Sequence, residues 1–321
     1  MPAPRADPLP SLPSVLDLTH DHPIPHTRAR GHRRHQPAAD RLLDDRHHAR
    51  PDQGRRGQGR RCRPRNRAPP RSRRGPRRRR PYAAGHLGVF RLTPAGAVRI
   101  ADRYQDTMAF TVTGPRTFLA SGHPSLADPT ATSPHLGLIR STDAAQTWTT
   151  VSAAGEADFH SLQQAGPTLY GLDSQTSQIW ASTDAGATWE RRAKIGAGDL
   201  AAHAGTPQKV WATTRDGLAR STDGGGHMPD GSWHAGSGRR GAAAPDQLIA
   251  LAADGRILTG SDGTSWAERG RLPEGARPAV LTAANPTHLL AGDTSDAVHE
   301  SKDGGRTWTT VHRPDHETTG H

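Results

Sequence analysis

One short motif recurs along the chain at nearly constant intervals. Each copy begins with Ser and Asp, continues through small residues, and in most copies leads into Thr-Trp. The aspartates of five copies are 39 to 41 residues apart. The copies contain Ser141, Asp143 and Trp148; Ser182, Asp184 and Trp189; Ser221 and Asp223; Ser261, Asp262 and Trp266; and Ser301, Asp303 and Trp308. So regular a spacing indicates that one structural unit is repeated along the chain.

The motif is typical of a tight turn between two strands. An apolar run at residues 136–140 leads into the first copy, and the next strand is expected to begin at Trp148. Ser and Asp oxygens accept hydrogen bonds from the amides of a turn, and Gly supplies positive φ. The Trp side chain can bury a large area between neighbouring sheets. We therefore expect the motif aspartates to hold turns together and not to perform catalysis.

Each repeated unit also contains earlier runs with strand character. In the unit that ends with the second copy, these runs are residues 159–163 and 168–172, followed by 178–182 and a strand after Trp189. Four short antiparallel strands in about 40 residues is the period of a β-propeller blade. The sequence therefore predicts an all-β protein, a β-propeller of about six four-stranded blades over residues 82–315, with a polar tail at 316–321.

A sixth, eroded copy lies before the other five. The segment that starts His86-Leu-Gly-Val-Phe-Arg aligns with the one that starts His135-Leu-Gly-Leu-Ile-Arg, and Pro94 takes the place of the motif aspartate. Its blade needs an inner strand before Tyr82. Residues 68–81 are rich in Arg and Pro, and Pro cannot donate to a strand ladder. We therefore expect an incomplete first blade, no regular sheet in residues 1–80 and a ring that closes poorly.

The composition changes abruptly near residue 81. Residues 1–81 contain 22 Arg, no Lys and seven Asp, whereas residues 82–321 carry a net charge of about −4 and all Phe, Tyr and Trp. Without aromatic residues the first segment cannot offset the entropy of ordering, so it is predicted to be disordered. Its arginines lack interleaved aromatic residues and a helix, so no specific nucleic-acid partner is expected. The printed sequence has no transmembrane span and no signal peptide.

The repeats resemble the Asp-box (bacterial neuraminidase, BNR) repeats of sialidases, sorting receptors and photosystem assembly factors. Residues 104–112, Ser121-Gly-His-Pro and Gly155-Glu-Ala-Asp-Phe-His are also similar to a family of actinobacterial exported proteins. The members are labelled sialidase-like or glycosyl-hydrolase-like, and many are lipoproteins. This resemblance covers nearly all of residues 82–312. It implies a protein outside the cell or anchored to the cell envelope, and we expect a monomer.

In that family the first blade begins with a strand resembling H-x-H-G-L-x-V-D-P. Residues 68–81 differ from it completely. Their codons, read one nucleotide later, permit H-L-H-G-V-A-V-D-P. We therefore hypothesise that residues 1–81 are a frameshifted reading of an exported propeller. The alternative is a genuine disordered Arg/Pro-rich leader, and the nucleotide sequence decides between the two.

Chemistry in a propeller usually lies on the loops that enter the innermost strands. We predict those strands at residues 108–112, 159–163, 200–204, 248–252 and 279–283. By resemblance, a sialidase would need three arginines, a Tyr nucleophile with a carboxylate base, and an acidic Asp. Tyr104, Asp106 and Glu156 are weak candidates for these catalytic roles. The Arg-Ile-Pro motif that presents the first of these arginines in sialidases is missing, and few arginines lie near the predicted inner strands.

A second interpretation is a metal or polar-ligand site made by His123, Asp158 and His160. Asp158 and His160 lie on one face of a strand, because strand side chains alternate. Imidazole with carboxylate suits zinc or another borderline divalent ion. Alternatively, these residues only form hydrogen bonds within the central channel of the propeller or cap the ends of strands.

The expected function is binding of a carbohydrate or protein ligand at the channel face without catalysis, and the alternative function is an exo-sialidase-like glycoside hydrolase.

Overall fold

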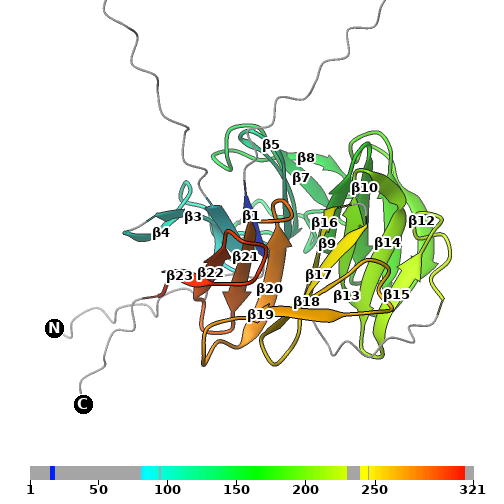
Figure 1. The fold of residues 1–321 in the computed structure, drawn as a ribbon. Coiled ribbons are helices and arrows are strands. Elements are labelled where there is room, and N and C mark those ends of the chain that lie inside the picture. The colour runs from blue at the N-terminus through cyan, green and yellow to red at the C-terminus, as the bar shows by residue number, and fades with distance from the viewer. Residues whose placement is uncertain (1–14, 19–80, 94, 230–238, 245, 315–321) are drawn as a thin grey trace, which may run out of the picture. The chain divides into compact units, whose positions relative to one another are not determined.

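Apolar runs that alternate with the repeated turns form antiparallel hairpins throughout the described chain (Figure 1). The computed structural model describes residues 15–18, 81–93, 95–229, 239–244 and 246–314. These residues belong to one unit and contain strands and turns but no helix. Within them, accordingly, no helix is long and apolar enough to cross a membrane. The fold class predicted from the repeats, all-β, is confirmed for this part of the chain.

The strands form six sheets, in each of which strands adjacent in sequence are paired. The first three sheets comprise β1 (Val15–Leu18), β2 (Pro81–Gly85), β3 (Gly88–Thr93) and β4 (Gly96–Arg99); β5 (Asp106–Gly114), β6 (Thr117–His123), β7 (Leu138–Ser141) and β8 (Thr149–Ser152); and β9 (Phe159–Ala165), β10 (Thr168–Asp173), β11 (Gln178–Ser182) and β12 (Glu190–Lys194). The last three comprise β13 (Ala197–His203), β14 (Thr206–Thr214) and β15 (Gly217–Ser221); β16 (Arg239–Ala244), β17 (Gln247–Leu251), β18 (Arg256–Gly260) and β19 (Ala267–Arg271); and β20 (Pro278–Ala283), β21 (Leu289–Asp293), β22 (Val298–Ser301) and β23 (Thr309–His312).

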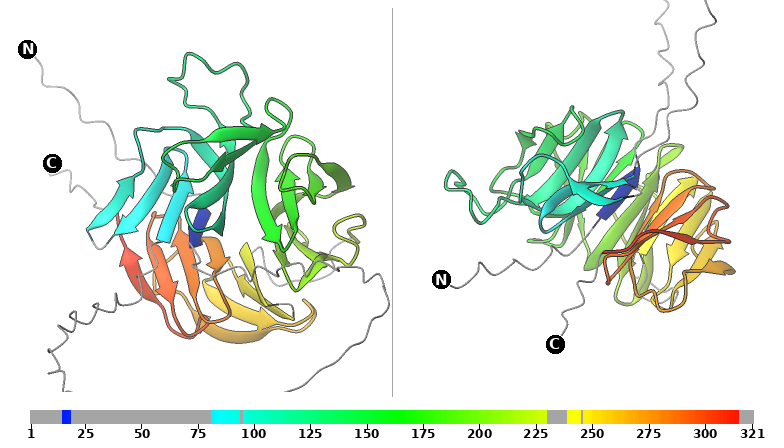
Figure 2. Two further views of the ribbon diagram at one scale, coloured as in Figure 1. Left: turned by 90° about the horizontal axis from the view of Figure 1, so that it is seen from above. Right: turned by 90° about the vertical axis from the view of Figure 1, so that its left-hand side faces the viewer.

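The first strand of each sheet contacts the first strand of the next. The contacts run from β1 to β5, β9, β13, β16 and β20 in turn, and β20 contacts β1 again. Figure 2 shows the sheets grouped around these inner strands. The described sheets therefore form a closed cycle.

This closure corrects two expectations about the first sheet. Residues 15–18 form β1, which pairs antiparallel with β2 from Val15 opposite Ala84 to Leu18 opposite Pro81. The first sheet therefore has four strands, so the expectation of an incomplete first blade with no strand in residues 1–80 is wrong. The expectation of a ring that closes poorly is also wrong, because β1 contacts both β5 and β20. A distant strand can take this place because the entropy of closing a loop grows only slowly with its length. The predictions of disorder and of a frameshift were made for residues 1–81, of which residues 15–18 and 81 form strands and residues 1–14 and 19–80 lie outside the described residues.

Two further strand predictions differ from the structure. Residues 248–252 were expected to be innermost, but they lie mainly in β17, and β16 takes the inner place. The Arg-Arg-Gly-Ala-Ala-Ala sequence of β16 lacks large apolar residues, so its pattern does not reveal a strand. The sheet of β13, β14 and β15 has three described strands instead of four, and residues 230–238, which follow the third repeated motif, lie outside the described residues. The other four predicted inner strands fall within or largely overlap β5, β9, β13 and β20.

The core lies between neighbouring sheets. Phe159 of β9 is fully buried, and its ring centroid lies 5.4 Å from that of Trp180 and 4.8 Å from that of Trp189. Aromatic rings at such separations contribute beyond the area they bury. Trp189 belongs to a repeated motif, so this motif Trp packs against a residue of β9, the inner strand of its own sheet. This packing fixes the start of β9, which carries part of the candidate site.

The repeated turn has the same hydrogen bonds in several copies. Ser141 Oγ donates to Asp143 Oδ1 at 2.9 Å, and Thr147 donates to the same carboxylate through its amide at 2.9 Å and its hydroxyl at 2.7 Å. Asp184 and Asp303 accept the equivalent bonds. In the shorter fourth copy, Asp262 accepts from the amides of Thr264 and Ser265. The motif side chains thus close their own turns.

Candidate functional site

A hollow of about 1150 Å³ opens beside the start of β5 and the end of β6. One wall comes from the β2–β3 turn, which carries His86, and from Tyr104 and Asp106 at the entry to β5. The other wall is formed by His123 at the end of β6 and by the connection that follows it, as far as His135. The hollow therefore lies where inner strands begin, the end of the fold at which the sequence predicted chemistry.

Asp158 precedes β9 and is almost fully buried, with 2% of its surface exposed. Its Oδ2 accepts a hydrogen bond from Ser174 Oγ at 2.7 Å and lies 3.0 Å from His160 Nε2. Burial opposes ionisation, but the bonds from His160 and Ser174 and the nearby imidazole charges hold the pKa of this carboxyl well below its usual range. The hydrogen bond with Asp158 in turn raises the pKa of His160. Asp158 is therefore a buried carboxylate anion.

His123, the last residue of β6, connects Asp158 to a second carboxylate. Its Nδ1 lies 3.3 Å from Asp106 Oδ2, and its Nε2 lies 3.4 Å from Asp158 Oδ1. Asp106 Oδ1 also lies 3.0 Å from His86 Nδ1. One carboxylate thus orients two imidazoles at the edge of the hollow.

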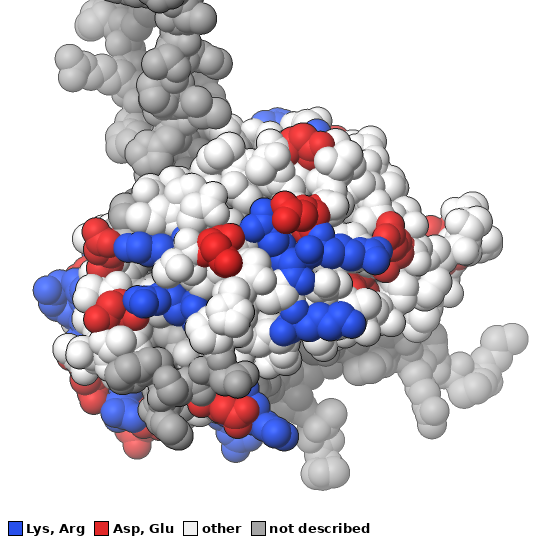
Figure 3. All heavy atoms as spheres, turned by 90° about the vertical axis from the view of Figure 1, so that its right-hand side faces the viewer, with Lys and Arg blue, Asp and Glu red and all other residues white. Residues whose placement is uncertain are grey.

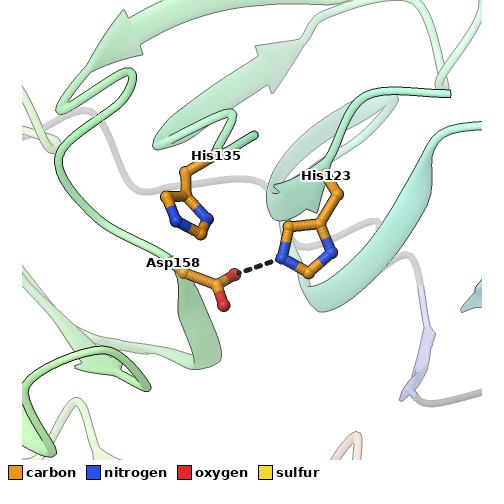
Figure 4. A group of neighbouring side chains, drawn as sticks. All are labelled: His123, His135 and Asp158. Atoms are coloured by element: carbon orange, nitrogen blue, oxygen red, sulfur yellow. Dashed lines mark ion pairs between the residues drawn. The ribbon is translucent and has the colours of Figure 1, made fainter. Parts of the chain in front are cut away.

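His135 completes this group of side chains from the β6–β7 connection (Figure 4). Its ring centroid lies 5.6 Å from that of His123. One potential ligand atom from each of His123, His135 and Asp158 lies within 4.8 Å of the others. Both His135 Nδ1 and Asp158 Oδ1 are buried and make no hydrogen bond. We call the following residues the His–Asp cluster: His86, Asp106, His123, His135, Asp158 and His160.

The structure brings together the three residues singled out for a metal or polar ligand, His123, Asp158 and His160. Their role stays a prediction. His160 Nε2 contacts Asp158 Oδ2, whereas His135, which sequence reasoning missed, joins His123 and Asp158 in the group whose potential ligand atoms lie within 4.8 Å of one another. The signal was present, because His86 and His135 occupy equivalent places in the aligned repeats and both line the hollow.

The three weak catalytic candidates, Tyr104, Asp106 and Glu156, each contact a different partner. Asp106 belongs to the His–Asp cluster. The Tyr104 ring lies under the Arg99 guanidinium, 3.9 Å from its carbon. Glu156 forms an ion pair with Arg191 of β12. Among the described residues that line the hollow there is no arginine, so those residues do not assemble the three-arginine carboxylate site expected of a sialidase.

Comparison with known proteins gives a fold and no family. No family model matches the chain, and no curated protein does. Among solved structures, a chain of the nidogen/laminin complex has a TM-score of 0.53 at 12% identity, over 72% of this chain and 92% of that one. A GH74 xyloglucanase from Xanthomonas campestris has a TM-score of 0.47 at 15% identity, over 72% of this chain and 43% of that one. YCF48 from Cyanidioschyzon merolae has a TM-score of 0.39 at 13% identity, over 64% and 84%. The likeness to the nidogen/laminin chain shows that this chain folds as a β-propeller.

Proposed function

We propose that this chain is an exported, six-bladed Asp-box propeller that binds a protein segment in the hollow beside β5 and β6 and does not turn it over. One observation carries the proposal: four members of the His–Asp cluster, His86, Asp106, His123 and His135, line the hollow, and arginines are absent among its described lining residues. Because a fold does not determine a function, the argument rests on this site.

The rim of the hollow favours a peptide over a sugar. The β6–β7 connection places Pro124, Leu126 and Ala127 along it, and the Leu126 side chain is fully exposed. Apolar pockets with a few convergent polar groups are typical ligand sites. Tyr104 is the aromatic residue of the lining, and the Arg99 guanidinium covers one face of its ring. A sugar ring usually stacks on the face of an aromatic ring, and Arg99 already occupies one face of Tyr104. An apolar peptide side chain needs only the apolar residues of the rim.

Selection of a displayed random peptide library on the purified chain tests this proposal, with a glycan array as the parallel arm. We expect selected peptides whose affinity falls about tenfold or more in Leu126→Glu, because a charge would then sit in the apolar contact. Val98→Glu is the matched control, since Val98 is also exposed but lies on β4 outside the hollow. Equal binding by Leu126→Glu, or glycan binding alone, would contradict the proposal.

A fluorogenic sialoside tests the absence of turnover. We expect no hydrolysis above the rate without protein, because the hollow offers no described arginine to a substrate carboxylate. Hydrolysis that disappears in Tyr104→Phe would replace the binding proposal with a glycoside hydrolase.

A further inference from the structure

We infer that His123, His135 and Asp158 form a binding site for one divalent cation of the zinc class, open toward the hollow. This inference goes beyond the proposed function, because the ion would bind whether or not the hollow accepts a peptide. It rests on three features of these side chains: their spacing, the buried atoms that lack hydrogen bonds, and the contacts that orient them.

The spacing of the ligand atoms fits a shared ion. His123 Nε2 and Asp158 Oδ1 are 3.4 Å apart. Two ligands placed about 2.1 Å from one tetrahedral ion are separated by roughly the same distance. The third ligand comes from His135, and all three atoms lie within 4.8 Å of one another. Small rotations of the half-buried His135 side chain bring it to the same ion.

Buried atoms without hydrogen bonds supply a second, independent observation. Asp158 is 2% exposed, and its Oδ1 makes no hydrogen bond. His135 Nδ1 is likewise buried without one. Buried polar atoms almost always have partners, and the exceptions call for an explanation such as an ion. Both atoms lie beside the position that a shared cation would take.

The remaining atoms of the ligands are held by neighbouring side chains. His123 Nδ1 lies 3.3 Å from Asp106 Oδ2, and Asp158 Oδ2 accepts from Ser174 Oγ at 2.7 Å. A metal-binding histidine typically donates its second ring nitrogen to a carboxylate, which fixes the ring and raises its basicity. The contact between Asp106 and His123 has this form, and it leaves Nε2 facing Asp158 Oδ1, where the ion would lie between the two atoms.

The donor set determines the class of ion. Two imidazoles and one carboxylate suit zinc and related borderline metals, whereas magnesium and calcium prefer oxygen ligands throughout. Three protein ligands leave a fourth position open. Because His123 and His135 line the hollow, that position is accessible from it. The two histidines also flank residues 124–134, so the ion would join the two ends of this loop.

Zinc titration of the full chain, stripped beforehand with a chelator, tests the inference. Isothermal calorimetry should show one strong site that His135→Gln and His123→Gln each weaken more than tenfold. Asp106→Asn should weaken it by about tenfold, because Asp106 orients a ligand without touching the ion. His288→Gln is the matched control, since His288 pairs with Glu300 away from the cluster. This control matters because the chain has 19 histidines that can bind zinc weakly.

Two further measurements keep the test decisive where a variant folds poorly. Zinc should raise the Tm of the unsubstituted chain, and magnesium should not. Zinc should also slow hydrogen exchange in residues 124–134. The partly exposed His123 allows substitution without loss of the core, so His123→Gln should fold but lose both effects. Unchanged zinc affinity in His123→Gln and His135→Gln, or no change in Tm at saturating zinc, would overturn the inference.

Discussion

At the scale of single residues, the repeated turn holds its carboxylate in the charged form. The hydroxyl and amide of Thr188 donate to Asp184 and lower the pKa of that carboxyl to about 2. The amide and hydroxyl of Thr147 lower the pKa of Asp143 to about 2 in the same way. A depressed folded-state pKa stabilises the fold above the pKa of the unfolded chain, and this contribution is lost as the pH falls through the folded value.

We therefore expect Asp184→Asn to lower the Tm by a few degrees at pH 7. The difference from the unsubstituted chain should shrink between about pH 4 and pH 2, where Asp184 itself becomes protonated. Circular dichroism melts at pH 7, 4 and 3 measure it. Asp246→Asn, which removes only an exposed pairing with Lys209, is the control. A Tm difference that does not change with pH would contradict the explanation.

Gly171 in β10 lies against the ring of the buried Phe159. A Cβ added there would come within 2.6 Å of the Phe159 ring. We expect Gly171→Ala to reduce the free energy of unfolding by about 1–3 kcal/mol, the usual cost of overpacking a core. Gly196→Ala is the control, because its Cβ would meet nothing within 4 Å, and denaturant titration compares the two. Equal stability of both variants would show that the ring can move aside.

At the scale of elements, the sequence reveals strands that carry large apolar residues. β9, β10 and β11 were predicted closely because residues such as Phe159, Tyr170 and Trp180 mark them. β16 and β1 were missed, since one is made of Arg, Gly and Ala and the other is an isolated run of four residues. In the candidate site, Asp158 and His160 were found from local spacing. His135 was not, because its approach depends on the path of a long loop.

Strand β1 provides a prediction about closure. Leu16→Pro with Asp17→Pro removes two backbone donors from β1. We expect faster hydrogen exchange in β2, whose residues 81–84 pair with β1. Leu16→Ala with Asp17→Ala keeps the donors and is the control. Unchanged exchange in β2 with the proline pair would mean that β1 does not contribute to protecting that strand.

At the scale of the whole molecule, charge is divided between two parts of the chain. The printed net charge of +11 arises because residues 1–81 carry about +15. Figure 3 shows positive and negative side chains side by side on the face that is at the right in Figure 1. In β12, Arg192 forms an ion pair with Glu190. The propeller therefore offers no single-sign field on that face, and the excess positive charge belongs to the first segment.

We expect the full chain to bind DNA duplexes of unrelated sequence with equal affinity. The affinity should fall steeply between about 50 and 200 mM salt, because arginines that neutralise phosphates release counterions. Deleting residues 23–78 should remove this binding. Fluorescence anisotropy with two duplexes of different sequence measures it. A preference for one duplex that persists at the higher salt would contradict the prediction of no specific nucleic-acid partner.

The contact between β1 and β20 has a consequence for biosynthesis. The ribosome makes β1 first and the final sheet last, since synthesis proceeds from the N-terminus. The inner strand of the first sheet cannot join its neighbour β20 until that final sheet has emerged. Contact between segments so distant in sequence forms slowly, and Ala83 and Leu92 of the first sheet, which pack with Leu290 of the last, remain uncovered on that side until it occurs. The nascent chain therefore exposes this apolar surface, a site prone to aggregation, until its last sheet has been synthesised.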